Sequence, residues 1–158
     1  MYIINYIVNI NIGDKMKENE INVLDELNKG CSMGIDAISF IKDKVKDKNF
    51  NKLLTKHLKL YKELSNDIEK EYKKYSDKEP HETSMMNKVM TYYGIEMKTK
   101  NDESTSKLAE LLVKGTNIGI IEGRRLLNHK NTNNKIHNII EKYVDYQEEM
   151  LDNLKEYL

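Results

Sequence analysis

Among its 158 residues the chain has a single cysteine, Cys31, and a single proline, Pro80. One cysteine excludes an internal disulfide and a zinc cluster built from several thiolates. A lone thiol also fits a reducing compartment, so the sequence predicts a cytoplasmic protein.

The chain also lacks an excess of charge of either sign. Lys plus Arg and Asp plus Glu both number 26, which gives a formal net charge of zero. No net field therefore draws the protein to nucleic acid or to an acidic membrane. Phosphate-binding motifs are missing as well, because Gly115, Gly119 and Gly123 are spaced by four and no strand precedes them.

The first fifteen residues differ in composition from the rest. Residues 2–12 are apolar and β-branched, but they are too few for a membrane span, which needs about 20 residues. They also lack the basic start and the cleavage site of a signal peptide. We expect residues 1–15 to form a loosely attached arm, or a leader with the natural start at Met16. Pairing of this arm with a second subunit is the alternative.

Residues 16–158 read as one all-α domain, because apolar residues recur there at helical spacing. The first helix is predicted from about Glu20 to Lys46. The second begins near Phe50, with Asn49 as a candidate N-cap. The third follows the cluster NDESTS at 101–106, and the fourth follows NHKNTNN at 128–134.

The last two helices repeat the first two. KGCSMGIDAI at 29–38 aligns without a gap to KGTNIGIIEG at 114–123, an offset of 85 residues. At an offset of 86, residues 50–68 align to 136–154, which pairs His57 with Tyr143 and Tyr61 with Gln147. The shared Gly-x-x-x-Gly favours an internal duplication over chance similarity between amphipathic helices.

Residues 75–103, which connect the two halves, are too many for a simple turn between antiparallel helices. We expect a crossover with a short helix that brings the chain back along the bundle, so that the helices before and after it run the same way. Its apolar stripe is Met86, Val89, Met90, Tyr93 and Met97. Packing against its own bundle is the favoured role of this stripe, and an adaptable partner surface is the alternative.

Two related helical hairpins joined by a long crossover resemble the ferritin-like arrangement. The segments VLDELNKGCSMGIDAI, FNKLLTKHLKLYKEL and LLVKGTNIGIIEGRRLL are similar to helices of small bacterial ferritin-like domains of unknown function. Those domains begin their first helix with a Leu-rich run followed by Asp-Gly-Glu-x-Gly or something close to it. The resemblance covers residues 20–158 and implies a ferritin-like four-helix bundle.

The resemblance also implies where a di-metal centre would lie. Ferritin-like metalloproteins use one Glu from each of two helices and a Glu-x-x-His from each of the other two. No Glu-x-x-His occurs in this chain. At the equivalent positions stand Cys31, His57, Thr116 and Tyr143, and the nearest acidic candidates are Asp36 and Glu122.

We therefore expect these four residues to be polar groups of the core that hydrogen-bond one another or a buried water. A single-metal or small-ligand site that uses His57 with Cys31 or Glu122 is the alternative, since imidazole and thiolate can bind zinc. A catalytic Cys/His pair is disfavoured, because a bundle centre does not activate a thiol.

The sequence predicts a structural or protein-interaction module that forms a homo-oligomer such as a dimer, with no catalytic residues and no cofactor. The alternative function is a divergent metal-storage protein or oxidoreductase that uses iron, manganese or zinc.

Overall fold

A computed structural model describes the backbone of residues 2–158 and the side chains of residues 13–158. This part of the chain is all-helical, as predicted, and contains no strand. Its helices are α1 (Tyr2–Lys42), α2 (Lys48–Tyr72), α3 (Met85–Thr99), α4 (Thr105–His129) and α5 (Asn134–Lys155).

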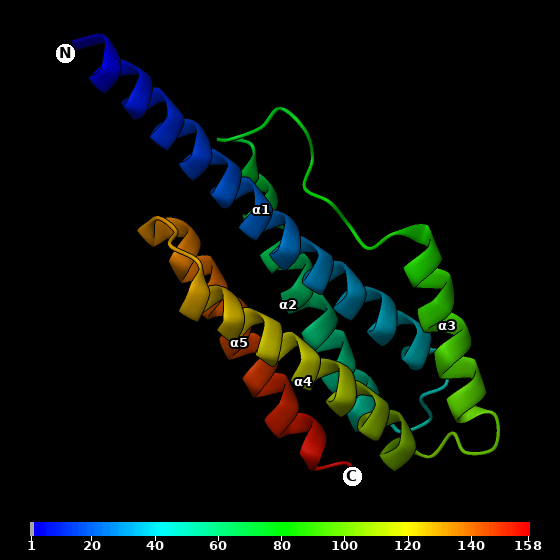
Figure 1. The fold of residues 1–158 in the computed structure, drawn as a ribbon. Coiled ribbons are helices and arrows are strands. Elements are labelled where there is room, and N and C mark those ends of the chain that lie inside the picture. Colours follow the sequence, from blue (N-terminus) through cyan, green and yellow to red (C-terminus); the bar gives the residue numbers. More distant parts are fainter. Residues whose placement is uncertain (1) are drawn as a thin grey trace.

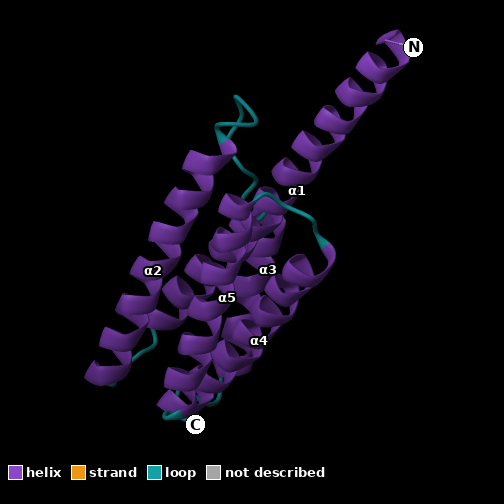
Figure 2. Cartoon of the chain, turned by 90° about the vertical axis from the view of Figure 1, so that its left-hand side faces the viewer, coloured by secondary structure: helices purple, strands orange, loops and turns teal. Residues whose placement is uncertain are grey.

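The longest helix, α1, begins earlier than the predicted start near Glu20. Its 41 residues correspond to a length of about 60 Å. No proline lies within it, so nothing in the sequence forces a break between the apolar start and the rest. Both views show α1 extending past the ends of the other helices (Figures 1 and 2). The side chains of residues 1–12 lie outside the described part, so the role of residues 1–15 as an arm stays a prediction.

Polar side chains fix where the other helices begin. Asp47, not the predicted Asn49, caps α2, and its carboxylate accepts a 2.7 Å hydrogen bond from the Phe50 amide. Ser104 caps α4 in the same way, and Asn133 caps α5. These side chains satisfy amide groups that have no partner within the helix.

Two antiparallel hairpins, α1/α2 and α4/α5, pack side by side around one core (Figure 1). Phe50 at the start of α2 packs on Tyr157 just after α5, with ring centroids 4.8 Å apart. Lys44, just after α1, bonds to Glu103 just before α4. These contacts make α1 antiparallel to α4, and α2 antiparallel to α5.

The connection between the hairpins, residues 73–104, contains α3 and runs along α1 (Figure 1). Its contacts fall on every fourth residue along α1, which is one face of a helix. We call this face the covered stripe of α1: Asn28, Ser32, Asp36 and Phe40, continued by Lys44 just after the helix ends.

Candidate functional site

The centre of the bundle holds a set of buried polar and aromatic side chains from four helices. Their exposed fractions lie between 0% and 6%. We call this set the central cluster: Cys31, His57, Tyr61, Thr116, Tyr143 and Gln147. The four residues at the positions that the resemblance implies, Cys31, His57, Thr116 and Tyr143, belong to it and are buried.

Tyr61 and Gln147 join the two hairpins across the centre. The Tyr61 hydroxyl donates a 2.7 Å hydrogen bond to Oε1 of Gln147. The two residues are 86 apart, the same offset that relates α2 to α5 in the sequence. The bond therefore joins two positions that the sequence repeat pairs with each other.

The helical glycines make room for these side chains. A Cβ on Gly34 would lie 2.6–2.9 Å from three ring atoms of Tyr61, and a Cβ on Gly119 would lie 2.6–3.1 Å from the amide group of Gln147. Gly34 and Gly119 are equivalent by the offset of 85. The same close approach therefore occurs in both hairpins, which supports the duplication.

Tyr143 breaks this equivalence. A Cβ on Gly30 would collide with the Tyr143 hydroxyl, and one on Gly123 would lie 3.1 Å from the Tyr143 ring. The equivalent of Tyr143 is the shorter His57, and the equivalent of Gly30 is Gly115. Gly115 has no atom within 4 Å of its Cβ position. The Tyr143 ring therefore fills the space beside Gly30, whereas the shorter His57 leaves the equivalent space beside Gly115 unfilled.

Burial keeps the central cluster uncharged near neutral pH. It raises the pKa of the Cys31 thiol to about 12. Burial also raises the pKa of Tyr143, with a smaller contribution from the neighbouring Cys31. A thiol with so high a pKa is neither a nucleophile nor a ready metal ligand at pH 7, because both roles require the thiolate.

His57 is only 2% exposed and bonds to α5 rather than to the other predicted site residues. Its Nε2 lies 3.4 Å from the Asn153 amide nitrogen. Burial lowers the pKa of His57 to about 4, although the carboxylate of Glu149 opposes this shift. The ring is therefore neutral at pH 7, with Nε2 facing a side-chain amide.

Both acidic candidates are already paired, Glu122 at the surface and Asp36 as a buried side chain under α3. Glu122 bonds to Arg125 one turn further along α4, at 2.5 Å, and its side chain is 56% exposed. Asp36 bonds to Lys88 of α3 at 2.9 Å. Within the described side chains, no group of three or more His, Cys, Asp or Glu residues is placed to hold a metal ion.

A second buried polar network, around Asp25 and Glu20 of α1, was not predicted. The Asp25 carboxylate accepts a 2.7 Å hydrogen bond from the His81 backbone amide. It also lies 2.9 Å from Nδ1 of the His81 ring. Nearby, Glu20 accepts a 2.9 Å bond from the Asn133 amide. Asp25 fixes the loop before α3, and Glu20 fixes the start of α5. The signal for this network in the sequence was the presence of two acidic residues, Glu20 and Asp25, on the apolar face of the first helix.

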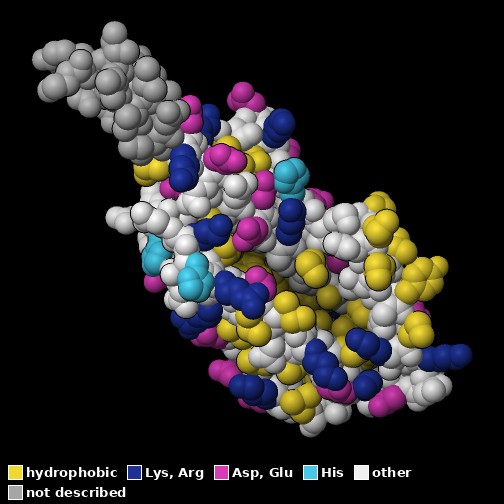
Figure 3. All heavy atoms as spheres, in the orientation of Figure 1, with side chains coloured by type: hydrophobic (Ala, Val, Ile, Leu, Met, Phe, Trp, Pro, Cys, Tyr) yellow, Lys and Arg dark blue, Asp and Glu magenta, His cyan; other side chains and the backbone are white. Residues whose placement is uncertain are grey.

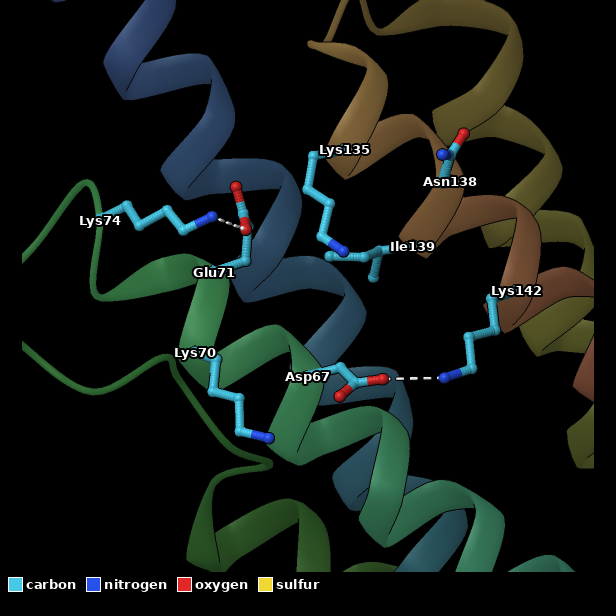
Figure 4. Close-up of a pocket in the computed structure, with 8 residues that line it drawn as sticks. All are labelled: Asp67, Lys70, Glu71, Lys74, Lys135, Asn138, Ile139 and Lys142. Carbon is cyan, nitrogen blue, oxygen red and sulfur yellow. Dashed lines mark hydrogen bonds and ion pairs between the residues drawn. The ribbon is translucent and has the colours of Figure 1, made fainter.

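A groove between α2 and α5 is lined mostly by charged side chains (Figure 4). Its volume is about 330 Å³. Lys142 bonds across it to Asp67 at 2.8 Å, and Lys74 bonds to Glu71 at 2.7 Å. Both carboxylates of the groove, those of Asp67 and Glu71, are therefore already paired, and the bond between Lys142 and Asp67 links the two hairpins.

Most of the exposed large hydrophobic residues in the described part of the chain belong to α3. We call it the α3 face: Met85, Met86, Val89, Met90, Tyr93 and Met97, with exposed fractions from 45% to 79%. Ile95 and Thr99 turn the opposite side of α3 toward the bundle and are buried. The short helix was predicted, but its methionine stripe points outward instead of packing against its own bundle, as Figure 3 shows for the hydrophobic side chains of α3.

No known protein family, curated protein or solved structure matches this chain.

Within the part of the chain that the structure describes, no helix is both long and apolar enough to cross a membrane.

Proposed function

We propose that the chain is a ferritin-like four-helix bundle without a di-metal centre, and that it works as a structural or protein-interaction module. The α3 face carries this proposal. Monomeric proteins rarely expose a large continuous apolar surface, and such surfaces mark sites where another protein docks. Methionine suits this role because its flexible thioether side chain adapts to different partner surfaces.

The arrangement of the helices supports the ferritin-like part of the proposal. Two antiparallel hairpins with similar sequence patterns, joined by a long connection, are the elements of that architecture. The long connection holds α3, so the architecture itself presents the proposed docking surface.

The chemistry of the central cluster supports the absence of a di-metal centre. Iron and manganese prefer carboxylate and imidazole ligands. The cluster instead supplies two phenols, an amide, a hydroxyl, a protonated thiol and one neutral imidazole. Beside these groups, the Tyr61 ring and the Gln147 amide pack against helical glycines and bond to each other between the hairpins.

Elemental analysis tests this part of the proposal. Protein purified from cells supplied with iron, manganese and zinc should contain each metal at well below one equivalent. The variant His57→Ala should show the same content. Stoichiometric metal that disappears in His57→Ala would establish the alternative, a divergent metal-storage protein or oxidoreductase.

A further inference from the structure

The α3 face is one part of a larger apolar surface. On α4 the exposed large hydrophobic residues are Ile118 and Ile121, 60% and 50% exposed, and α1 adds Met33 at 48%. Met33 is the neighbour of Ser32 of the covered stripe in the sequence. Figure 3 shows the hydrophobic side chains of α3 and α4 on one side of the molecule, with a hollow between them.

The internal repeat indicates that α4 lacks a cover that α1 has. Shifting the covered stripe of α1 by 85 residues gives its counterpart on α4: Val113, Asn117, Ile121, Arg125 and His129. In the first half, residues 81–103 pack over this face. In the second half the equivalent residues from Asn117 onward are exposed, and no described segment of the chain packs over them.

The charges around this surface favour an identical partner over a strongly charged one. Its edges carry ion pairs that are already formed within the chain, namely Lys88 with Asp36, Lys44 with Glu96 and Arg125 with Glu122. Such an edge selects neither an acidic nor a basic partner. The chain has a formal net charge of zero, so two copies approach without net repulsion.

We propose that a second copy of this chain covers this surface, with the α3 face of each copy packed over Ile118 and Ile121 of the other. This inference rests on the proposed role as an interaction module. A twofold axis that runs between α3 and α4, parallel to them, places each α3 opposite the partner's α4. The contact is then self-complementary and closes as a dimer.

Analytical ultracentrifugation tests the proposal on the whole chain over concentrations from about 1 to about 300 μM. We expect a dimer. Met90→Glu on α3 and Ile118→Glu on α4 should each raise the dimer dissociation constant by about 100-fold, because each buries an unpaired carboxylate in the interface. The control Asn66→Glu adds the same charge to an exposed position of α2 and should leave the constant unchanged.

Cross-linking then tests which helices meet. The native Cys31 is fully buried, so introduced cysteines report alone. Oxidation of a mixture of Met90→Cys and Ile118→Cys chains should give more disulfide-linked dimer than either variant alone. A monomer at every concentration, a dimer that neither glutamate weakens, or cross-links in Met90→Cys alone that match the mixture would each overturn this proposal. None of these results changes the elemental analysis, so the proposed function is tested separately.

Discussion

In the α1/α2 hairpin, Gly34 packs against the ring of Tyr61, and at the equivalent place in the α4/α5 hairpin, Gly119 packs against the amide of Gln147. The backbone plan of the two halves is the same, whereas the side chain that fills the gap has changed. Each glycine costs about 1 kcal/mol relative to alanine within a helix. The close packing of a large partner side chain offsets that cost, which explains why both helices retain their glycines.

The second equivalent pair shows how far the halves have diverged. Tyr143 reaches from α5 to Gly30 on α1, but His57 on α2 has no such contact with Gly115 on α4. The outer faces differ as well. Residues 81–103 pack over the covered stripe of α1, whereas no described segment packs over the equivalent residues of α4 from Asn117 onward. The two halves therefore differ in the side chains that fill their cores and in whether a connecting segment packs over their outer helix.

The largest predicted effect is the loss of stability in acid that His57, in the first half, causes for the whole protein. Burial lowers the pKa of folded His57 to about 4, against an ordinary value of 6.5. Between these values only the unfolded chain binds the proton, so the free energy of unfolding falls as the pH drops from 6.5 toward 4. The loss assigned to His57 is about 3 kcal/mol.

Replacing His57 with the residue of the other half, in His57→Tyr, should remove this part of the pH dependence. Urea unfolding at pH 7 and pH 4.5 measures it. The exposed-histidine control His129→Gln should lose stability with acid as the unmodified protein does. Equal acid losses in His57→Tyr and the unmodified protein would show that His57 is not buried in its neutral form.

The next largest effect separates the two equivalent glycines. Gly34→Ala should destabilise the protein by about 1–2 kcal/mol, since the strain of overpacking against the buried Tyr61 ring exceeds the gain in helix propensity. Gly119→Ala should cost less, because the Gln147 amide is the end of a flexible side chain and can move. Thermal and urea unfolding measure both. A larger cost at Gly119 than at Gly34 would contradict the packing described for the two hairpins.

A smaller effect is expected from the bond between the hairpins. Tyr61→Phe removes the hydroxyl that bonds to Gln147 and leaves a buried acceptor unpaired, at a cost of about 1 kcal/mol. Tyr93→Phe, on the exposed side of α3, should change the free energy of unfolding by less than about 0.5 kcal/mol. A double-mutant cycle with Gln147→Leu should show a coupling between residues 61 and 147. Additive effects would mean that the two hairpins do not bond at this position.

The smallest effect has the opposite sign. Gly115→Ala should stabilise the protein by about 0.5–1 kcal/mol, because nothing lies within 4 Å of the new Cβ and alanine favours a helix. The equivalent Gly30→Ala should destabilise, since its Cβ would collide with Tyr143. Equal effects of the two substitutions in urea unfolding would show that Tyr143 does not distinguish the two halves.

Local signals in the sequence predicted much of the helical structure. The all-α class follows from the spacing of apolar residues, and the interest in Cys31, His57, Thr116 and Tyr143 came from the resemblance to ferritin-like helices. The start of α2 was placed two residues late, because Asp47 and Asn49 are both good caps. The sequence pattern alone does not decide which of them bonds the helix.

Contacts that depend on how distant segments meet were not predictable. The repeat pairs Tyr61 with Gln147, but only the placement of one hairpin on the other reveals their hydrogen bond. The bond between Asp25 and His81 joins residues 56 apart through an irregular loop. The outward direction of the methionines on α3 likewise depends on how α3 is rotated against α1, and a stripe of apolar residues fits either orientation.

The central claim is that the centre of this bundle is a neutral packed core that needs no metal. Thermal unfolding of chelator-treated protein, with and without added iron(II), manganese(II) or zinc(II), tests it most directly. A ligand that binds only the folded state must raise the melting temperature. We predict a change of less than about 1 °C for each metal. A rise of several degrees that is lost in His57→Ala would contradict the claim.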